Sequence, residues 1–186
     1  MSTRETRAAF ELRADGGSTR RPRLVGYAAV FDSPSKDLGG FTEIVKPGAF
    51  RRSLGSQSQD QLALVHHIPH LVLGRRSAGT LRLQEDSRGL HFEVDMPDTQ
   101  AARDLLVSIE RRDVQGASFA FSVPKGGDRW ERRGEKSVRE LLDVDLHEIT
   151  LTPTPAYPET SVARRALAAL VAFPRVAIAR RYLETV

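Results

Sequence analysis

The chain lacks cysteine, has a single tryptophan, and contains only 6% aromatic residues among its 186. Without cysteine there can be no disulfide, thiol nucleophile or cysteine-bound metal, which agrees with a reducing compartment. Any nucleophile must therefore be a hydroxyl, an amine or a carboxylate. No apolar run approaches the roughly 20 residues that cross a bilayer, and residues 1–17 contain no continuous apolar stretch like that of a secretory signal. We expect neither membrane insertion nor export.

Neither sign of charge dominates the chain. Lys and Arg number 28 against 24 Asp and Glu, a net charge of +4, and the pI is about 9.8. The basic residues lie in scattered short pairs such as Arg20-Arg21 and Arg164-Arg165. Such scatter is typical of a solvated surface, whereas single-stranded nucleic acid binds a continuous basic groove with exposed aromatics. We therefore expect no specific nucleic-acid partner.

The composition, 40% hydrophobic and 28% charged, is typical of one globular domain that needs no disulfide or metal to form a core. In the first half, short apolar runs bounded by Gly, Pro and polar residues predict strands and turns. We expect residues 1–7 to fray. We expect strands at 9–15, 23–31, 41–46 and 62–67, a turn at 16–18, a short helix at 49–54 and a loop at 55–61.

Two elements in the middle of the chain have clear periodicity. Strict alternation of apolar and polar residues predicts a hairpin over 80–96. Apolar residues at helical spacing predict an amphipathic helix over 98–113, with Asp98 as its N-cap. The apolar positions are Leu81, Leu83, Leu90, Phe92, Val94 and Met96 in the hairpin, and Ala101, Ala102, Leu105, Leu106 and Ile109 in the helix.

Residues 116–123 return to a period of two, which predicts a strand with two unlike faces. The faces carry Phe119, Phe121 and Val123 on one side and Ser118, Ala120 and Ser122 on the other. The face with small side chains can border a cleft. After this strand, charged residues and glycines around Trp130 predict a mobile loop or an exposed hairpin tip over 125–137.

The strand-like segment 138–151 changes its apolar phase near its middle. Leu142, Val144 and Leu146 share one parity, whereas Ile149 and Leu151 take the other. The change falls at His147-Glu148, as a β-bulge or a switch between exposed and buried faces produces. Because bulges often re-aim functional side chains, this dipeptide becomes a candidate part of a site.

The order of elements defines the expected fold class. After Pro153, Thr160 or Ser161 can cap a final helix that Pro174 divides. Roughly seven strands, a central helix and a terminal helix without βαβ alternation predict an α+β fold dominated by antiparallel sheet or barrel. The sequence contains no G-x-S-x-G elbow, Walker loop, H-E-x-x-H motif or dinucleotide fingerprint. A hydrolase built on a parallel sheet is therefore disfavoured.

Three of the five histidines, His66, His67 and His70, fall within the segment HHIPH. The cluster suggests a zinc site, but neighbours on a strand point to opposite faces, and His70 lies beyond Pro69. We therefore expect no metal and no other cofactor, with His66 and His70 at the surface. His91 is a polar position of the alternating hairpin and is expected to face solvent.

Ser118 is the best candidate nucleophile for a hydrolase without cysteine, in which a histidine deprotonates the serine and a third group orients the histidine. It follows Gly116 and Ala117 and has little bulk beside it to exclude a substrate backbone. A serine that is merely tolerated on a half-buried strand explains the same pattern. Pattern alone leaves both interpretations open.

Several blocks, in order, resemble the prohead maturation proteases of tailed bacteriophages and of phage-derived gene transfer agents. They are GYAAVFDS and IVKPGAF, a histidine ahead of Leu73-Gly74, the hairpin segment QEDSRGL, the strand GASFAF, and HEITLTPTPAY. The resemblance covers about residues 23–163. It implies a fold similar to that of the herpesvirus assemblins, with a barrel-like β core surrounded by helices.

The resemblance also implies a serine nucleophile, which matches Ser118, and a histidine base, which matches His67. An acidic residue usually follows the family's histidine, whereas Ile68 follows here. His66 therefore stays open as the alternative base.

The third catalytic residue implied by the family has more than one candidate. Glu148 matches the acidic position ahead of the S/T-L-T segment and is our first choice. Asp145 is the second, with Asp143 on the same stretch. His147 is the third and would mimic the Ser-His-His arrangement of the assemblins.

The resemblance implies a serine endopeptidase that removes the scaffolding segment of the major capsid protein and cleaves itself. It places the protein inside the assembling procapsid in the bacterial cytoplasm, where it would self-associate. We expect a frayed segment or strand at 1–22, a protease domain at 23–163 and a helical tail at 164–186. Two alternatives stay open: an inactive scaffold or capsid-assembly protein of the same fold, and a nucleic-acid-binding β-barrel suggested by the pI.

Overall fold

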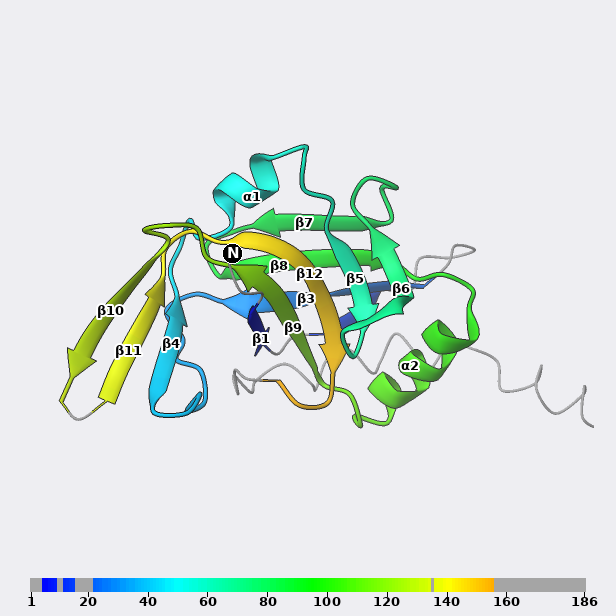
Figure 1. The fold of residues 1–186 in the computed structure, drawn as a ribbon. Helices are drawn as coiled ribbons and strands as arrows, with labels where there is room; N and C mark the ends of the chain where they lie inside the picture. The colour runs from blue at the N-terminus through cyan, green and yellow to red at the C-terminus, as the bar shows by residue number, and fades with distance from the viewer. Residues whose placement is uncertain (1–4, 10–11, 16–21, 135, 156–186) are drawn as a thin grey trace, which may run out of the picture.

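The computed structural model describes residues 5–9, 12–15, 22–134 and 136–155 (Figure 1). The strands are β1 (Glu5–Ala9), β2 (Leu12–Asp15), β3 (Arg23–Val30), β4 (Phe41–Val45), β5 (Leu62–Val65), β6 (Ile68–Arg75), β7 (Leu81–Glu85), β8 (Gly89–Asp95), β9 (Gly116–Ser122), β10 (Asp128–Arg133), β11 (Lys136–Leu141) and β12 (Asp145–Thr152), and the helices are α1 (Arg51–Gly55) and α2 (Gln100–Glu110). The fold is mostly β-sheet with few helices. In these ranges the strands form three sheets and no closed barrel.

The five-stranded sheet has the order β1-β9-β12-β5-β6. β9 runs antiparallel to both β1 and β12, whereas β5 runs parallel to β12. The expected fraying of residues 1–7 is wrong for residues 5–7, because β1 pairs with β9 along its whole length. This pairing satisfies the backbone groups of β9, a strand in which every residue is buried. Residues 1–4 lie outside the described part.

The four-stranded sheet, β2-β3-β8-β7, confirms the strong hairpin of the sequence. β7 and β8 pair antiparallel as expected, and Leu90, Phe92 and Val94 are completely buried. The expected pairing of the first two strands is also confirmed by β2 and β3. The turn predicted at 16–18 between them lies outside the described residues.

The three-stranded sheet, β10-β11-β4, projects from the rest of the molecule as an arm, at the left of Figure 1. Its β10–β11 hairpin agrees with the exposed hairpin tip predicted for 125–137. Trp130 is 54% exposed on the arm and packs on Phe41 with 5.0 Å between ring centroids. Local aromatic packing covers the outer part of the arm, and its inner end joins the main core through the completely buried Val45 and Leu141.

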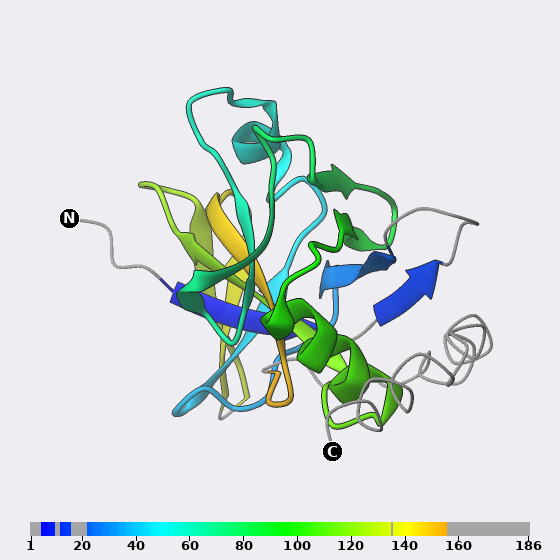
Figure 2. The ribbon, with the colours of Figure 1, turned by 90° about the vertical axis from the view of Figure 1, so that its right-hand side faces the viewer.

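Both expected helices in the described part are present. α1 is the short helix predicted before the polar loop, and α2 the amphipathic helix, with Ala102, Leu105 and Ile109 buried. The predicted N-cap is wrong by one residue, because the hydroxyl of Thr99 accepts the N–H of Ala102. α2 faces the viewer in Figure 2, with the arm behind it.

The core joins β9 to the rest of the molecule through aromatic residues. Phe119 lies edge-on to Phe50 at 5.4 Å between centroids and stacks on Phe121 at 5.2 Å. All three side chains are fully buried, and aromatic pairs of this kind add to the stabilisation from buried area. One face of β9 is thus fixed in the core. The helix expected after Thr160 lies outside the described residues, and within them no helix is long and apolar enough to span a membrane.

Candidate active site

The candidate site is built on β9 and β12, which pair antiparallel inside the five-stranded sheet. Their register sets Ser118 opposite Thr150 and Ala120 opposite Glu148. Because cross-strand partners and alternate residues share a face, these four side chains lie on the same face of the sheet. Phe119, on the other face, is packed in the core. The small-residue face predicted from the sequence therefore meets a polar face of β12.

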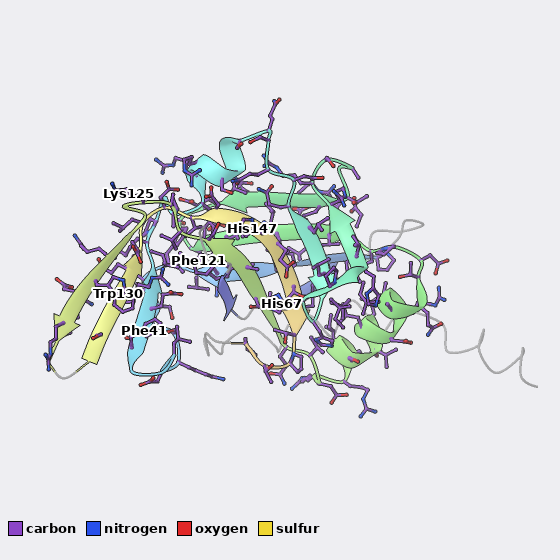
Figure 3. All side chains as sticks on the ribbon, viewed as in Figure 1. Phe41, His67, Phe121, Lys125, Trp130 and His147 are labelled. Carbon is purple, nitrogen blue, oxygen red and sulfur yellow. The ribbon has the colours of Figure 1, made fainter. Side chains whose placement is uncertain are left out.

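A register shift between Leu146 and Glu148 confirms the irregularity predicted from the phase change. His147 is the extra residue, and its Nε2 lies 2.9 Å from the Oγ of Ser122. Past the bulge, Glu148 takes its place on the face of Ser118. The bulge thus sends two neighbouring side chains to different partners. Figure 3 labels His147 near the start of β12 and His67 farther along the strand.

His66 and His67 form a two-residue turn between β5 and β6, in which Val65 pairs with Ile68. Their φ angles are 51° and 60°, and positive φ at both central positions is the property of type I′ hairpin turns, where Asn and Gly are usual. Left-handed backbone costs a residue with a Cβ roughly 1–2 kcal/mol. The prediction that the strand runs to residue 67 is therefore wrong, since the chain reverses after Val65.

The turn brings His67 to Glu148. The Nδ1 of the imidazole lies 2.6 Å from Oε1 of the carboxylate, and the Glu148 side chain is only 5% exposed while that of His67 is 32% exposed. A buried carboxylate in this position accepts the Nδ1 proton and fixes the tautomer, which leaves Nε2 as the proton acceptor. His66 is exposed.

Thr150 connects this turn to the strand of the serine. Its Oγ1 accepts the backbone N–H of His67 at 2.9 Å and donates to the carbonyl of Leu64 at 3.0 Å. It is also the cross-strand partner of Ser118, whose exposure is only 3%. Ser118 and His67 are therefore both neighbours of one completely buried threonine.

The alternative acidic residues are held elsewhere. Asp145 accepts hydrogen bonds from Gln59 and Arg52, and Asp143 accepts one from Arg52. Burial by itself would raise the pKa of Asp145, but the bonds from Gln59 and Arg52 outweigh it and hold the pKa below its ordinary value. Both carboxylates lie before the bulge, Asp143 in the connection that precedes β12 and Asp145 as the first residue of that strand. The candidate for the third residue that contacts His67 in the described part of the chain is Glu148.

The remaining histidines do not add ligands to the site. His70 is exposed on β6, as expected. His91 is half-buried rather than fully exposed, because its ring packs edge-on against Tyr27 at 5.2 Å. Across the described ranges no group of three or more His, Asp or Glu side chains is arranged to hold a metal ion.

Sequence reasoning missed Thr150. The residue stands in the HEITLT block, but nothing in the pattern distinguishes it from a polar residue on a strand. The signal that could have found it is the two-residue spacing from Glu148, which on a strand puts both side chains on one face. Recognising its role also required knowing that β5 pairs in parallel with β12, a long-range contact that local periodicity does not encode.

Comparison with known proteins supplies the family. The family model of caudovirus prohead serine proteases matches residues 8–171, which is most of the chain. No curated protein and no solved structure gives a match. The matched segment includes both histidines of the turn, the serine strand and the bulged strand. The chain therefore belongs to the caudovirus prohead serine protease family, whose members are peptidases of capsid maturation.

Proposed function

We propose that this protein is a serine endopeptidase in which Ser118 is the nucleophile, His67 the general base and Glu148 the residue that orients the base. The observation that carries the proposal is the 2.6 Å contact between His67 Nδ1 and Glu148 Oε1, beside the strand of Ser118. In a hydroxyl–imidazole–carboxylate arrangement the carboxylate selects the tautomer in which Nε2 can accept a proton.

The reaction would proceed by acyl transfer. Ser118 Oγ attacks the scissile carbonyl carbon while His67 Nε2 takes the hydroxyl proton, and the imidazolium is stabilised by the Glu148 carboxylate. The imidazolium then protonates the departing amide nitrogen, the peptide bond breaks, and an acyl ester remains on Ser118. Water, deprotonated by the same imidazole, attacks the ester and releases the second product with Oγ reprotonated.

The environment of Ser118 supports its role as the nucleophile. It lies on a strand whose same-face neighbour is Ala120, so no large side chain of β9 stands beside the hydroxyl. The opposite face of the strand is anchored by Phe119 and Phe121. A nucleophile needs this kind of rigid support because small displacements of reacting groups cost large factors in rate.

The family supplies the class of substrate. A prohead protease acts on capsid protein within the procapsid, and we propose that this chain removes the scaffolding segment of the major capsid protein and also cleaves itself. We propose that it self-associates inside the procapsid in the bacterial cytoplasm. The likeness to the fold of the herpesvirus assemblins and the division into 1–22, 23–163 and 164–186 remain predictions.

Coexpression with the cognate capsid protein tests the proposal directly. We expect the native chain to shorten the capsid protein, and Ser118→Ala to leave it at full length. Equal shortening by both would show that Ser118 is not the nucleophile. Shortening by neither, with both chains folded, would support the non-catalytic scaffold function instead. Electrophoresis and mass spectrometry of the capsid protein measure the outcome and give the cleavage site.

A further inference from the structure

A buried threonine connects three strands at the candidate site. Thr150 lies on β12, between β9 with Ser118 on one side and β5 on the other. It is 0% exposed. Its Oγ1 accepts the His67 N–H at 2.9 Å and donates to the Leu64 carbonyl at 3.0 Å. A hydroxyl has one proton to donate and lone pairs to accept with, so both bonds form together.

The backbone that Thr150 holds is strained. His66 and His67 both have positive φ, a conformation that residues other than Gly, Asn and Asp adopt at a cost and that persists only where surrounding contacts enforce it. The N–H of His66 donates to the carbonyl of Leu151 at 3.1 Å. The His67 N–H has Thr150 as its partner. Two consecutive residues of β12 therefore hold the two residues of the turn.

We propose that Thr150 is a positioning residue for catalysis, which holds the His66–His67 turn in its left-handed conformation and thereby sets the imidazole of His67 against Glu148. The inference rests on the proposed roles of Ser118 and His67. Glu148 and Thr150 are alternate residues of one strand. One fixes the ring of His67 through Nδ1 and the other fixes its backbone, so the imidazole is held at two points by a single rigid strand.

The cross-strand position of Thr150 gives this arrangement a further consequence. Ser118 is the register partner of Thr150 on β9, and side chains so placed have Cβ atoms roughly 4.5–5.5 Å apart. The same residue therefore sets the position of the histidine turn relative to the serine strand. A substitution that removes the hydroxyl leaves the pairing of the strands intact but frees the turn.

The test uses the full chain and a fluorophosphonate probe, whose attachment to Ser118 is located by mass spectrometry. Thr150→Val conserves shape and removes both hydrogen bonds. We expect it to slow labelling of Ser118, and kcat for capsid-protein cleavage, by about 10- to 100-fold, with KM changed by less than about threefold, because the base is displaced while substrate contacts remain. Thr150→Ser keeps the hydroxyl and is expected to label within about threefold of the native rate.

Thr152→Val is the matched control. Thr152 is the next residue on the same face of β12, is 7% exposed, and its hydroxyl accepts the backbone N–H of Thr154 at 3.4 Å. The same change there should leave labelling unaltered. Circular dichroism and thermal unfolding verify that the variants are folded, and if Thr150→Val does not fold, Thr150→Ala compared with Thr150→Ser at reduced temperature gives the same contrast.

A second-site change separates positioning of the turn from a general packing defect. Glycine adopts positive φ without steric cost, so His66→Gly in the Thr150→Val background should recover at least about threefold of the lost labelling rate. The proposal is wrong if Thr150→Val labels at the native rate, or if Thr150→Ser is as slow as Thr150→Val. Failure of the proposed function has a different signature: the probe attaches elsewhere, or Ser118→Ala still cleaves capsid protein.

Discussion

The parallel pair β5–β12 has a histidine near each of its ends, His67 just after β5 and His147 near the start of β12, and the two have different partners. At the end of β5, His67 contacts the Glu148 carboxylate from a strained turn. At the start of β12, His147 contacts Ser122, while Asp145 is bound by Arg52 and Gln59. A serine–histidine hydrogen bond alone therefore does not identify the candidate site. The carboxylate on Nδ1 and the enforced backbone of the turn make the first end different.

This contrast predicts that substitutions at the His67 end lower catalytic rate, whereas equivalent substitutions at the His147 end change stability with little effect on rate. The largest difference in rate is expected between substitutions of the two serines of β9. Ser118→Ala should reduce cleavage of capsid protein by at least about 10³-fold, since the covalent route is lost. Ser122→Ala should keep the rate within about threefold, with about 1 kcal/mol lost from the free energy of unfolding. Timed electrophoresis measures the rates. A large rate loss in Ser122→Ala would place the active site at Ser122 and His147 instead of Ser118 and His67.

The adjacent histidines of the turn provide the next comparison. His67→Ala should lower kcat by about 10³-fold or more, because the proposed general base is removed. His66→Ala should stay within about fivefold of the native rate, since His66 is exposed and a surface substitution usually changes little. Single-turnover kinetics measure both. Equal losses in the two variants would undo the choice of His67 over His66.

Neutralising the carboxylate of Glu148, which contacts His67, and that of Asp145, two residues before His147, tests the same contrast. Glu148→Gln is expected to lower kcat by about 10²- to 10⁴-fold at unchanged KM, because the amide no longer selects the tautomer with a free Nε2. Asp145→Asn should retain nearly native kcat but unfold at lower urea concentration, since the neutral amide binds Arg52 and Gln59 less strongly than the carboxylate does. If Asp145→Asn were the slower enzyme, Asp145 would replace Glu148 as the orienting residue.

The smallest effect is a pH dependence at the start of β5. Asp60 accepts hydrogen bonds from Ser77, through its side chain and backbone, and from Arg75, which lower its pKa from 3.8 to about 2. A carboxylate with a depressed pKa in the folded state stabilises the fold above its unfolded pKa and loses that contribution as pH falls through the folded pKa. The stability difference between native protein and Asp60→Asn should therefore be constant above about pH 5 and shrink between about pH 4 and 2.

Urea unfolding at a series of pH values measures this difference, and kcat of Asp60→Asn at neutral pH should equal that of the native chain. A difference that did not change with pH would show that Asp60 acts through packing instead of charge. A loss of kcat would show that the two ends of β5 are coupled.

Local pattern predicted much of this molecule. Alternation at 80–96 predicted the β7–β8 hairpin, helical spacing predicted α2, and the parity change at His147-Glu148 predicted the bulge in β12. These features depend on contacts between residues close in sequence, or on one buried face, and both leave a periodic signal. The strand β1 was missed because its residues have no apolar alternation and pair only with β9, far along the chain.

The sequence by itself determined the unlike faces of the serine strand and the position of the bulge, because both follow from side-chain alternation. Only the tertiary structure decided which histidine meets which carboxylate. His67 and Glu148 are 81 residues apart, and they meet because β5 and β12 pair in parallel and the chain reverses after Val65. A two-residue turn with positive φ at two histidines has no local sequence signal, since Asn and Gly normally mark it. Long-range strand pairing enforces it, with Thr150 and Leu151 of β12 holding the two N–H groups of the turn.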